Sequence, residues 1–164
     1  MTTTTASPPR FRTVTGAGTI VALVLVLAFG NSAYRDWAQK HTSATDAGGL
    51  FLRRLGWPAW SFDTNESLRS LLATDLKALL VVVLAAVFLS LLSVTAGFGV
   101  RGITGAIFGG WGAYIFAAAV AGLIAAFVNV NASLVGALNA AGDGALYGLF
   151  VGWIVGLTTL AFRA

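Results

Sequence analysis

The chain has 164 residues, of which 57% are hydrophobic and only 10% are charged, and its mean hydropathy is +0.85. Because a soluble domain has roughly a quarter of its residues charged, lipid is the expected solvent for most of this chain, and its length permits one compact unit. The net charge is +4, but Lys and Arg stand singly or in pairs, which excludes a basic run that binds nucleic acid. The chain has no cysteine and one histidine, His41; this excludes disulfides, thiolate sites and multi-histidine sites, and we expect no metal or other cofactor.

The first apolar run covers residues 16–33 and includes the sequence TIVALVLVLAFG. It is just long enough to cross a hydrocarbon core of ~30 Å as a helix. Residues 1–15 before it are rich in Thr and Pro and basic, and we expect a disordered tail. The basic flank, the short apolar core and the small residues at 28 and 30 are also typical of a cleaved signal peptide. We favour the uncleaved helix, and both interpretations place the N-terminus inside and the following loop outside.

Residues 34–75 form the polar part of the chain, with ten of its sixteen Lys, Arg, Asp and Glu residues. The middle of this loop combines arginine with tryptophan: Arg53, Arg54, Trp57 and Trp60. This is the composition of the lipid headgroup layer, where an amphipathic ring and a long cation are both satisfied. We therefore expect an amphipathic segment on the membrane, broken at Gly56 and Pro58, that contacts lipid or a partner. An ordinary loop packed on the helices is the alternative.

The second span is predicted at 76–96, as the end of a longer helix. Asp63 followed by Glu66 has the spacing of a capping box at a helix start. Leucines then recur at helical spacing, and from residue 78 the sequence is apolar on all sides. The start of this helix is therefore expected to project from the membrane and the rest to cross it.

Two further apolar stretches complete the predicted fold. A glycine-rich turn at 97–102 precedes a third span at 103–128, and the polar turn NVNAS precedes a fourth at 134–162. The fold class that follows is all-α: an integral membrane protein with four transmembrane helices in a single domain, 16–164.

The orientation follows from the Lys and Arg residues in short flanks. With the N-terminus inside, Arg10, Arg12, Arg101 and Arg163 are all cytoplasmic, whereas the basic residues of the first loop lie outside and disagree. Because the first helix usually dominates the orientation, we expect a multi-pass protein of a bacterial-type cytoplasmic membrane with both termini cytoplasmic.

Small residues recur at every fourth position in the last two spans, where they form two ladders. The ladders are Gly105, Gly109, Ala113, Ala117, Ala121 and Ala125 in the third span, and Gly144, Gly148, Gly152 and Gly156 in the fourth. Residues four apart lie nearly above one another on a helix, so each ladder is a groove without side chains. In lipid such grooves permit close packing of helix backbones.

The sequence does not determine which helix packs into these grooves. The third and fourth helices are the plain choice, and copies of the chain or another subunit are alternatives. A pore lined by a glycine zipper, or compositional chance in a chain with so much Gly and Ala, are further interpretations.

Asp143 is the only acid after residue 75. If the fourth helix begins near Ser133, Asp143 lies about 15 Å into it and needs a partner. If the helix spans only from residue 145, Asp143 caps its N-terminus. A role in handling protons or cations is a third option. Lys77, at the same end of the second helix, is the predicted partner in an ion pair.

These patterns give three function classes. We expect a non-catalytic accessory or assembly subunit of a membrane complex, with membrane lipids and other subunits or copies of itself as partners. The alternative is a transport or channel component, alone or as an oligomer, with Asp143 as an ion- or proton-sensitive residue. A lipid-modifying enzyme is third, because Asp36, His41 and Asp46 are too loosely spaced in the first loop to indicate a catalytic site.

Overall fold

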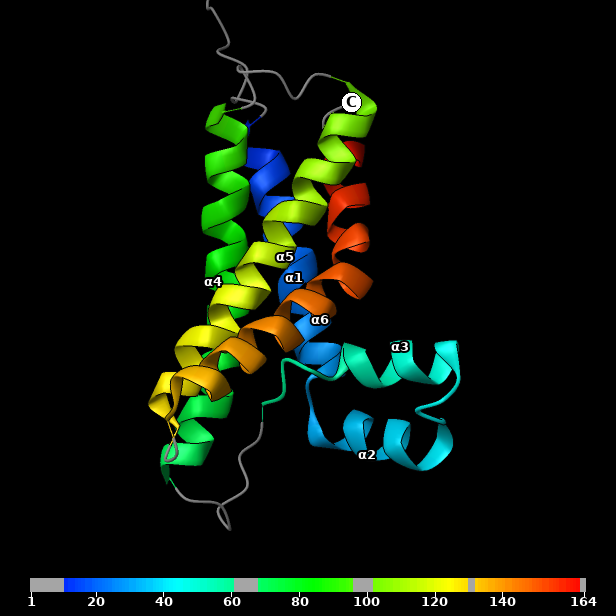
Figure 1. Cartoon of the computed structure of the whole chain (residues 1–164). Coiled ribbons are helices and arrows are strands. Elements are labelled where there is room, and N and C mark those ends of the chain that lie inside the picture. Colours follow the sequence, from blue (N-terminus) through cyan, green and yellow to red (C-terminus); the bar gives the residue numbers. More distant parts are fainter. Residues whose placement is uncertain (1–10, 61–67, 96–101, 130–131, 163–164) are drawn as a thin grey trace, which may run out of the picture.

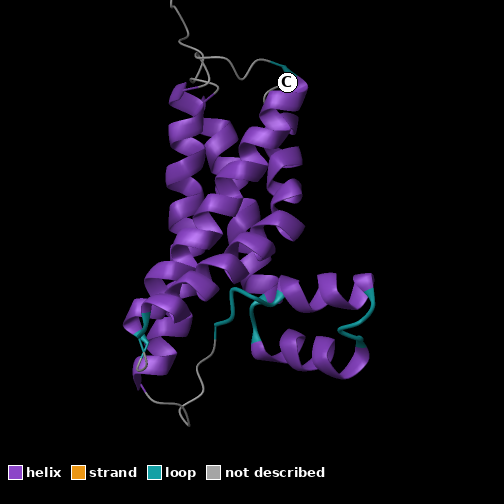
Figure 2. Cartoon of the chain, viewed as in Figure 1, coloured by secondary structure: helices purple, strands orange, loops and turns teal. Residues whose placement is uncertain are grey.

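The structure, a computed structural model, describes residues 11–60, 68–95, 102–129 and 132–162. Within these residues all regular secondary structure is helical (Figure 2). The helices are α1 (Phe11–Phe29), α2 (Ser32–His41), α3 (Ala47–Leu55), α4 (Leu68–Thr95), α5 (Ile103–Val128) and α6 (Leu134–Ala161).

The four longer helices form a bundle in which each runs opposite to the next along the chain (Figure 1). α1 packs on α4 and α6, and α5 packs on the same two helices, so the order around the bundle is α1, α4, α5, α6. The start of α1 and the end of α6 lie at one end of the bundle. The shorter helices α2 and α3 project to one side near the other end (Figure 1).

Three helical segments are long and apolar enough to cross a membrane: Leu71–Ser93, Ile103–Val128 and Leu134–Ala161. A fourth crossing is formed if α1 and α2 count as one span, because Val14–Phe29 and Ser32–His41 pass the same test together but are bent by 65°. The all-helical fold is therefore confirmed, with three candidate spans in the described residues and up to four with the bent pair.

The expected boundaries agree best for the last two helices. Ile103–Val128 and Leu134–Ala161 coincide with the predicted 103–128 and 134–162 within one residue. α4 begins well before 76, as the leucine spacing indicates. The proposed cap at 63–66 lies outside the described residues, as do most of the turn at 97–102 and residues 130–131 of the next turn. α1 begins at Phe11, inside the segment expected to be a disordered tail.

The first helix ends at Phe29, before the predicted end at residue 33, because a new helix begins at Ser32. The Asn31 side chain accepts a hydrogen bond from the Tyr34 amide at 2.8 Å and donates one to the Ala28 carbonyl at 2.7 Å. It thereby caps the start of α2 and satisfies a carbonyl at the end of α1. Gly30 lies between the helices where a Cβ atom would stand only 2.6 Å from the Val26 carbonyl oxygen and 2.8 Å from the Trp60 ring.

The first loop is a helical hairpin rather than an irregular segment. α3 starts at a second cap, where Asp46 accepts from the Gly49 amide at 3.2 Å, and it ends at Leu55 before Gly56. The predicted break at Gly56 is therefore present, and the amphipathic residues before it form one helix of a pair. Asn31 and Asp46 are typical N-cap residues. They are the signals from which the starts of the two helices could have been predicted.

Candidate functional site

The glycine ladder of α6 lies directly against the backbone of α5. All four of its glycines are buried. A Cβ atom on Gly144 would overlap the Ala118 carbonyl oxygen, and one on Gly148 would lie 2.6 Å from Ile115 Cα. This ladder therefore lies in a seam between α5 and α6 in which the backbones approach too closely for any side chain at these positions.

The ladder of α5 faces α4, rather than the ladder of α6, at Gly109. Ala113, Ala117, Ala121 and Ala125 are buried and Gly105 is half-buried, but a Cβ atom on Gly109 would meet Leu92 of α4 at 2.6 Å. The glycines of α5 that approach α6 closely are Gly110 and Gly122. A Cβ atom on Gly110 would lie 3.1 Å from Gly156 Cα, and one on Gly122 would overlap the Ala140 carbonyl oxygen.

A second set of contacts crosses the seam through side chains. The Trp111 indole donates to the Leu149 carbonyl at 3.0 Å, and the Thr159 hydroxyl donates to the Ala106 carbonyl at 3.2 Å. These hydrogen bonds join α5 to α6 along the seam. They are directional, unlike the van der Waals contacts that make up the rest of the packing there.

Two buried tyrosines meet inside the bundle. Tyr114 of α5 and Tyr147 of α6 are both 0% exposed, and their hydroxyl oxygens lie 2.9 Å apart. The Trp57 ring stacks on Tyr147 with centroids 5.3 Å apart and planes at 25°. The Lys77 Nζ atom lies 4.9 Å from the centroid of the Trp57 ring, within the range of a cation–π interaction. These four side chains, the tyrosine–tryptophan stack, run from the hairpin end into the core.

Asp143 forms an ion pair with Arg54, with Arg54 Nη1 and Asp143 Oδ1 3.0 Å apart. The two side chains are 28% and 52% exposed. The predicted pair with Lys77 is therefore wrong in its partner, because the hairpin places Arg54 against α6 while the Lys77 ammonium lies over Trp57. Arg35 and Asp143 still lie close enough to Lys77 for their charges to act on it.

Asp143 is also not the N-cap of α6. That position belongs to Ser133, whose hydroxyl accepts from the Gly136 amide at 3.0 Å. Asp143 lies inside the helix, but its half-exposed side chain makes it neither a cap nor a deeply buried acid.

The predicted interfacial residues all bond within the chain. Arg53 joins α3 to α2: its Nε donates to the Thr42 hydroxyl at 3.1 Å and its Nη2 to the Gln39 carbonyl at 3.0 Å. The Trp60 indole donates to the Val26 carbonyl at 3.0 Å, which ties the segment after α3 to the end of α1. The expected contact of Arg53, Arg54, Trp57 and Trp60 with lipid or a partner stays a prediction.

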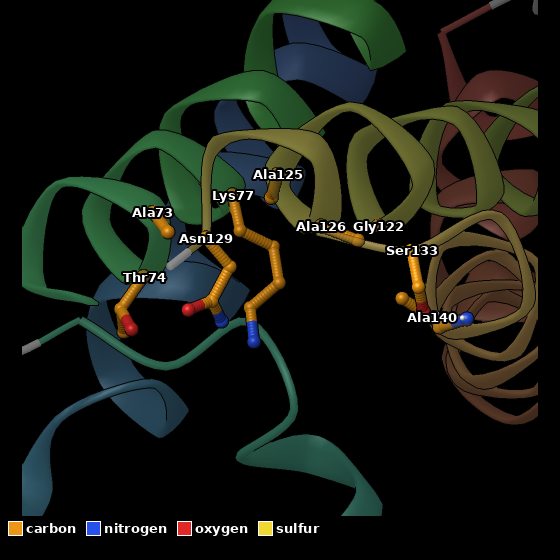
Figure 3. A pocket seen from close by; sticks show the side chains of 10 residues that line it. Ala73, Thr74, Lys77, Gly122, Ala125, Ala126, Asn129, Ser133 and Ala140 are labelled. Atoms are coloured by element: carbon orange, nitrogen blue, oxygen red, sulfur yellow. Dashed lines mark hydrogen bonds between the residues drawn. The ribbon is translucent and has the colours of Figure 1, made fainter. Parts of the chain in front are cut away.

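Two cavities adjoin this end of the bundle. The first, of about 310 Å³, lies where α4, α5 and α6 meet. Figure 3 shows the side chains of Thr74, Lys77 and Asn129 together at its wall. The second, of about 570 Å³, lies between α2 and α3, and three arginines line it: Arg35, Arg53 and Arg54.

His41 and the acids of the hairpin do not come together as a group of metal ligands among the described residues. In the described part of the chain, no three His, Asp or Glu side chains gather as a metal ion requires. His41 lies at the end of α2, where its ring stacks on Trp37 with centroids 5.5 Å apart and its Nδ1 lies 2.9 Å from the Trp37 carbonyl.

Compared with protein-family models, with curated proteins and with solved structures, the chain gives no match. The class of protein therefore follows from its own features. An all-helical bundle with three helices long and apolar enough to cross a membrane is the architecture of a multi-pass membrane protein.

Some residues of this site had weak sequence signals. Tyr114 and Tyr147 are single polar residues inside the predicted third and fourth spans, where polar residues are expected to have partners. Arg35 stands beside Asp36 in the predicted loop, where its sequence neighbours do not distinguish it. Gly110 and Gly122 belong to a different four-residue series of α5 from the predicted ladder, and a count of spacings favours neither series.

Proposed function

We propose that this chain is a non-catalytic accessory or assembly subunit of a complex in a bacterial-type cytoplasmic membrane, with both termini cytoplasmic. The observation that carries the proposal is the docked hairpin. α2 and α3 are joined to each other by Arg53 and to α6 by the Arg54–Asp143 ion pair. A docked element that presents Trp37 and Leu50 to its surroundings is suited to contact another protein.

The interior of the bundle supports this function over transport through a single copy. Beyond the tyrosine pair, the buried side chains of α6 are Val151 and Val155, before Thr159 near the other end. A path for ions or protons needs polar groups that continue across the membrane. A transport component, the alternative, would therefore need its path between copies or between subunits.

The test is affinity purification of the full chain from native membranes into nanodiscs, followed by quantitative mass spectrometry. We expect one partner protein at a constant molar ratio across preparations. Trp37→Ala combined with Leu50→Ser should lower its recovery severalfold, because these side chains are exposed on the hairpin. The control is Leu79→Ala, an exposed apolar residue of α4, which should leave the ratio unchanged.

Recovery of the chain alone, as a monomer, would contradict the accessory function. Equal loss of the partner in the hairpin variant and in Leu79→Ala would remove the hairpin as the contact surface. A constant ratio that only the hairpin variant changes supports both parts of the proposal.

A further inference from the structure

The cavity between α2 and α3 is lined by an unusual set of charges. Its volume is about 570 Å³, and its lining residues include Arg35, Arg53 and Arg54 but no acid within the described part of the chain. The volume exceeds the roughly 30 Å³ that one water occupies in the liquid many times over. The cavity is therefore large enough for a polyatomic ion, and its charge favours an anion.

The three guanidinium groups differ in how far their donors are used. Arg53 Nε and Nη2 bond to Thr42 and Gln39 and hold the hairpin together. Arg54 gives Nη1 to Asp143. The Nε of Arg35 is buried and has no hydrogen-bond partner among the described residues. The buried Nε is shielded from the cavity and is not available to an occupant. The Arg35 side chain nevertheless lines the cavity, and among the described residues no hydrogen bond holds its other donors, so these are the groups that an occupant would complete.

Several features hold Arg35 in place. It lies in the first turn of α2, close behind the Asn31 cap. A Cβ atom on Gly56 would lie 2.8 Å from Arg35 Cγ, so the glycine after α3 leaves room for the side chain to pass. The Trp57 ring forms part of the same wall. These contacts hold the Arg35 guanidinium group at the wall of the cavity.

The chemistry of the donors indicates the anion. A guanidinium group presents parallel N–H donors in a fixed fork that matches two phosphate oxygens. Basic pockets at the membrane surface bind the phosphates of lipid headgroups in the same way. The hairpin projects to one side near one end of a bundle whose helices are long enough to cross the membrane (Figure 1), so a position of the cavity at the level of the headgroups is part of the proposal.

We propose that this cavity is an anion site that binds a phosphate group, with Arg35 as its principal ligand and Arg54 as the second. The phosphate belongs to a lipid headgroup or to a soluble phosphate compound, and the chemistry of recognition is the same for both. The site goes beyond the accessory function: it requires no partner protein, and it is tested on the purified chain alone.

The experiment uses the full chain, purified in a neutral detergent without phosphate, and two probes. In the first arm, inorganic phosphate is titrated against chloride at constant ionic strength and binding is followed by calorimetry. In the second, retention of phosphatidylglycerol over phosphatidylcholine is measured by native mass spectrometry. We expect Arg35→Gln to weaken binding about tenfold, because it removes a charge-assisted pair of hydrogen bonds. Arg35→Lys should fall between, because it keeps the charge and loses the fork.

The matched control is Lys40→Gln, which removes one positive charge from the exposed side of the same helix and does not line the cavity. It should change binding less than about twofold, because exposed charges act weakly through solvent. Unchanged helical circular dichroism and gel-filtration profiles establish that each variant is folded. If Arg35→Gln does not fold, the comparison is made with Arg35→Lys.

The two arms identify the source of the phosphate. If binding depends on Arg35 only for phosphatidylglycerol, the natural ligand is a lipid headgroup. If binding depends on Arg35 only for inorganic phosphate, the natural ligand is a soluble phosphate compound. Dependence in both arms assigns a site that lipid and free phosphate share. Equal effects of Arg35→Gln and Lys40→Gln, or no binding of either probe to the unmodified chain, would overturn the proposal.

Discussion

At the scale of single residues, the tyrosine pair is a polar contact buried inside the bundle. The two hydroxyl oxygens are 2.9 Å apart and both side chains are fully buried, so one hydroxyl donates to the other where water does not reach. A buried polar group that loses its partner costs much more than the net value of the bond. The pair is therefore expected to behave as a unit.

This unit gives the first prediction. Tyr114→Phe and Tyr147→Phe should each lower the free energy of unfolding by about 1–3 kcal/mol, because each leaves one hydroxyl buried and unsatisfied. The double variant should lose less than the sum of the two, because no orphaned hydroxyl remains. Reversible unfolding of the purified chain in mixed detergent micelles measures all three values. Additive losses would show that the hydroxyls do not depend on each other.

The Arg54–Asp143 ion pair gives a second prediction. Both side chains are partly exposed, so a double-mutant cycle of Arg54→Gln and Asp143→Asn should give a coupling of about 0–1 kcal/mol. Salt at about 1 M should reduce this coupling, because it screens exposed charges. The comparison cycle pairs Lys77→Gln with Asp143→Asn and should show weaker coupling, since Lys77 lies over Trp57. Stronger coupling to Lys77 would reinstate the partner predicted from the sequence.

At the scale of elements, the seam between α5 and α6 determines how closely the last two helices pack. The closest approaches are between backbones, at Gly144 and Ala118 and at Gly122 and Ala140. Because lipid removes the hydrophobic drive for helices to associate, such close contact is a main source of helix packing in membranes. Adding even one methyl group here moves a whole helix rather than one side chain.

The third prediction tests the seam with two glycines on one helix. Gly144→Ala should destabilise the bundle by about 1–3 kcal/mol through overpacking, because its Cβ atom would overlap the Ala118 carbonyl. Gly142→Ala is the matched control: a Cβ atom there has nothing within 4 Å, and alanine raises helix propensity by up to about 1 kcal/mol. Thermal melting in detergent compares the two. Equal melting temperatures would show that α5 and α6 separate easily at this point.

At the scale of the whole molecule, the bundle separates two ends with different chemistry. The hairpin, the Arg54–Asp143 pair and both arginine- and lysine-lined cavities lie at one end, and the start of α1 and the end of α6 lie at the other (Figure 1). The proposed orientation assigns the first of these ends to the outside of the cell.

The absence of cysteine from the sequence permits a direct test of this orientation, the fourth prediction. Ser43→Cys places a thiol in the exposed turn of the hairpin, and Ala161→Cys places one at the exposed end of α6. A maleimide that does not cross membranes should label the first in intact cells and the second only after permeabilisation. The reverse pattern would invert the orientation, and labelling of both in intact cells would contradict an odd number of crossings between them.

Much of the fold was predictable because the membrane limits the alternatives. An apolar segment in lipid must satisfy its backbone internally, so long runs such as 103–128 and 134–162 are helices whatever surrounds them. The bent first span was not predicted, because the length of its apolar run says nothing of the Asn31 cap that starts a new helix inside it. Asn31 and Asp46 are N-cap residues in the sequence, but no long apolar run follows either of them, so neither indicated a helix start by itself.

The candidate site was predictable only in part. Asp143 stands out from the sequence as a lone acid, yet its partner depends on where the hairpin folds back, and this brings Arg54 to it across 89 positions of sequence. The glycines of α6 do lie in a closely packed groove. The spacing of residues alone, however, does not determine which face of α5 is turned toward α6. The seam therefore involves Gly110 and Gly122 of α5, whereas Gly109 of the predicted ladder faces α4.

The sequence by itself determined that the chain is all-helical and apolar enough for a membrane, and where its long helices lie. Those properties depend on local composition and on the need of every backbone group for a hydrogen bond. The tertiary structure alone decided which helix faces meet, which charges pair and that the first loop folds into a hairpin over an arginine-lined cavity. These features depend on the rotation and docking of whole elements, which arise from contacts between residues far apart in the chain.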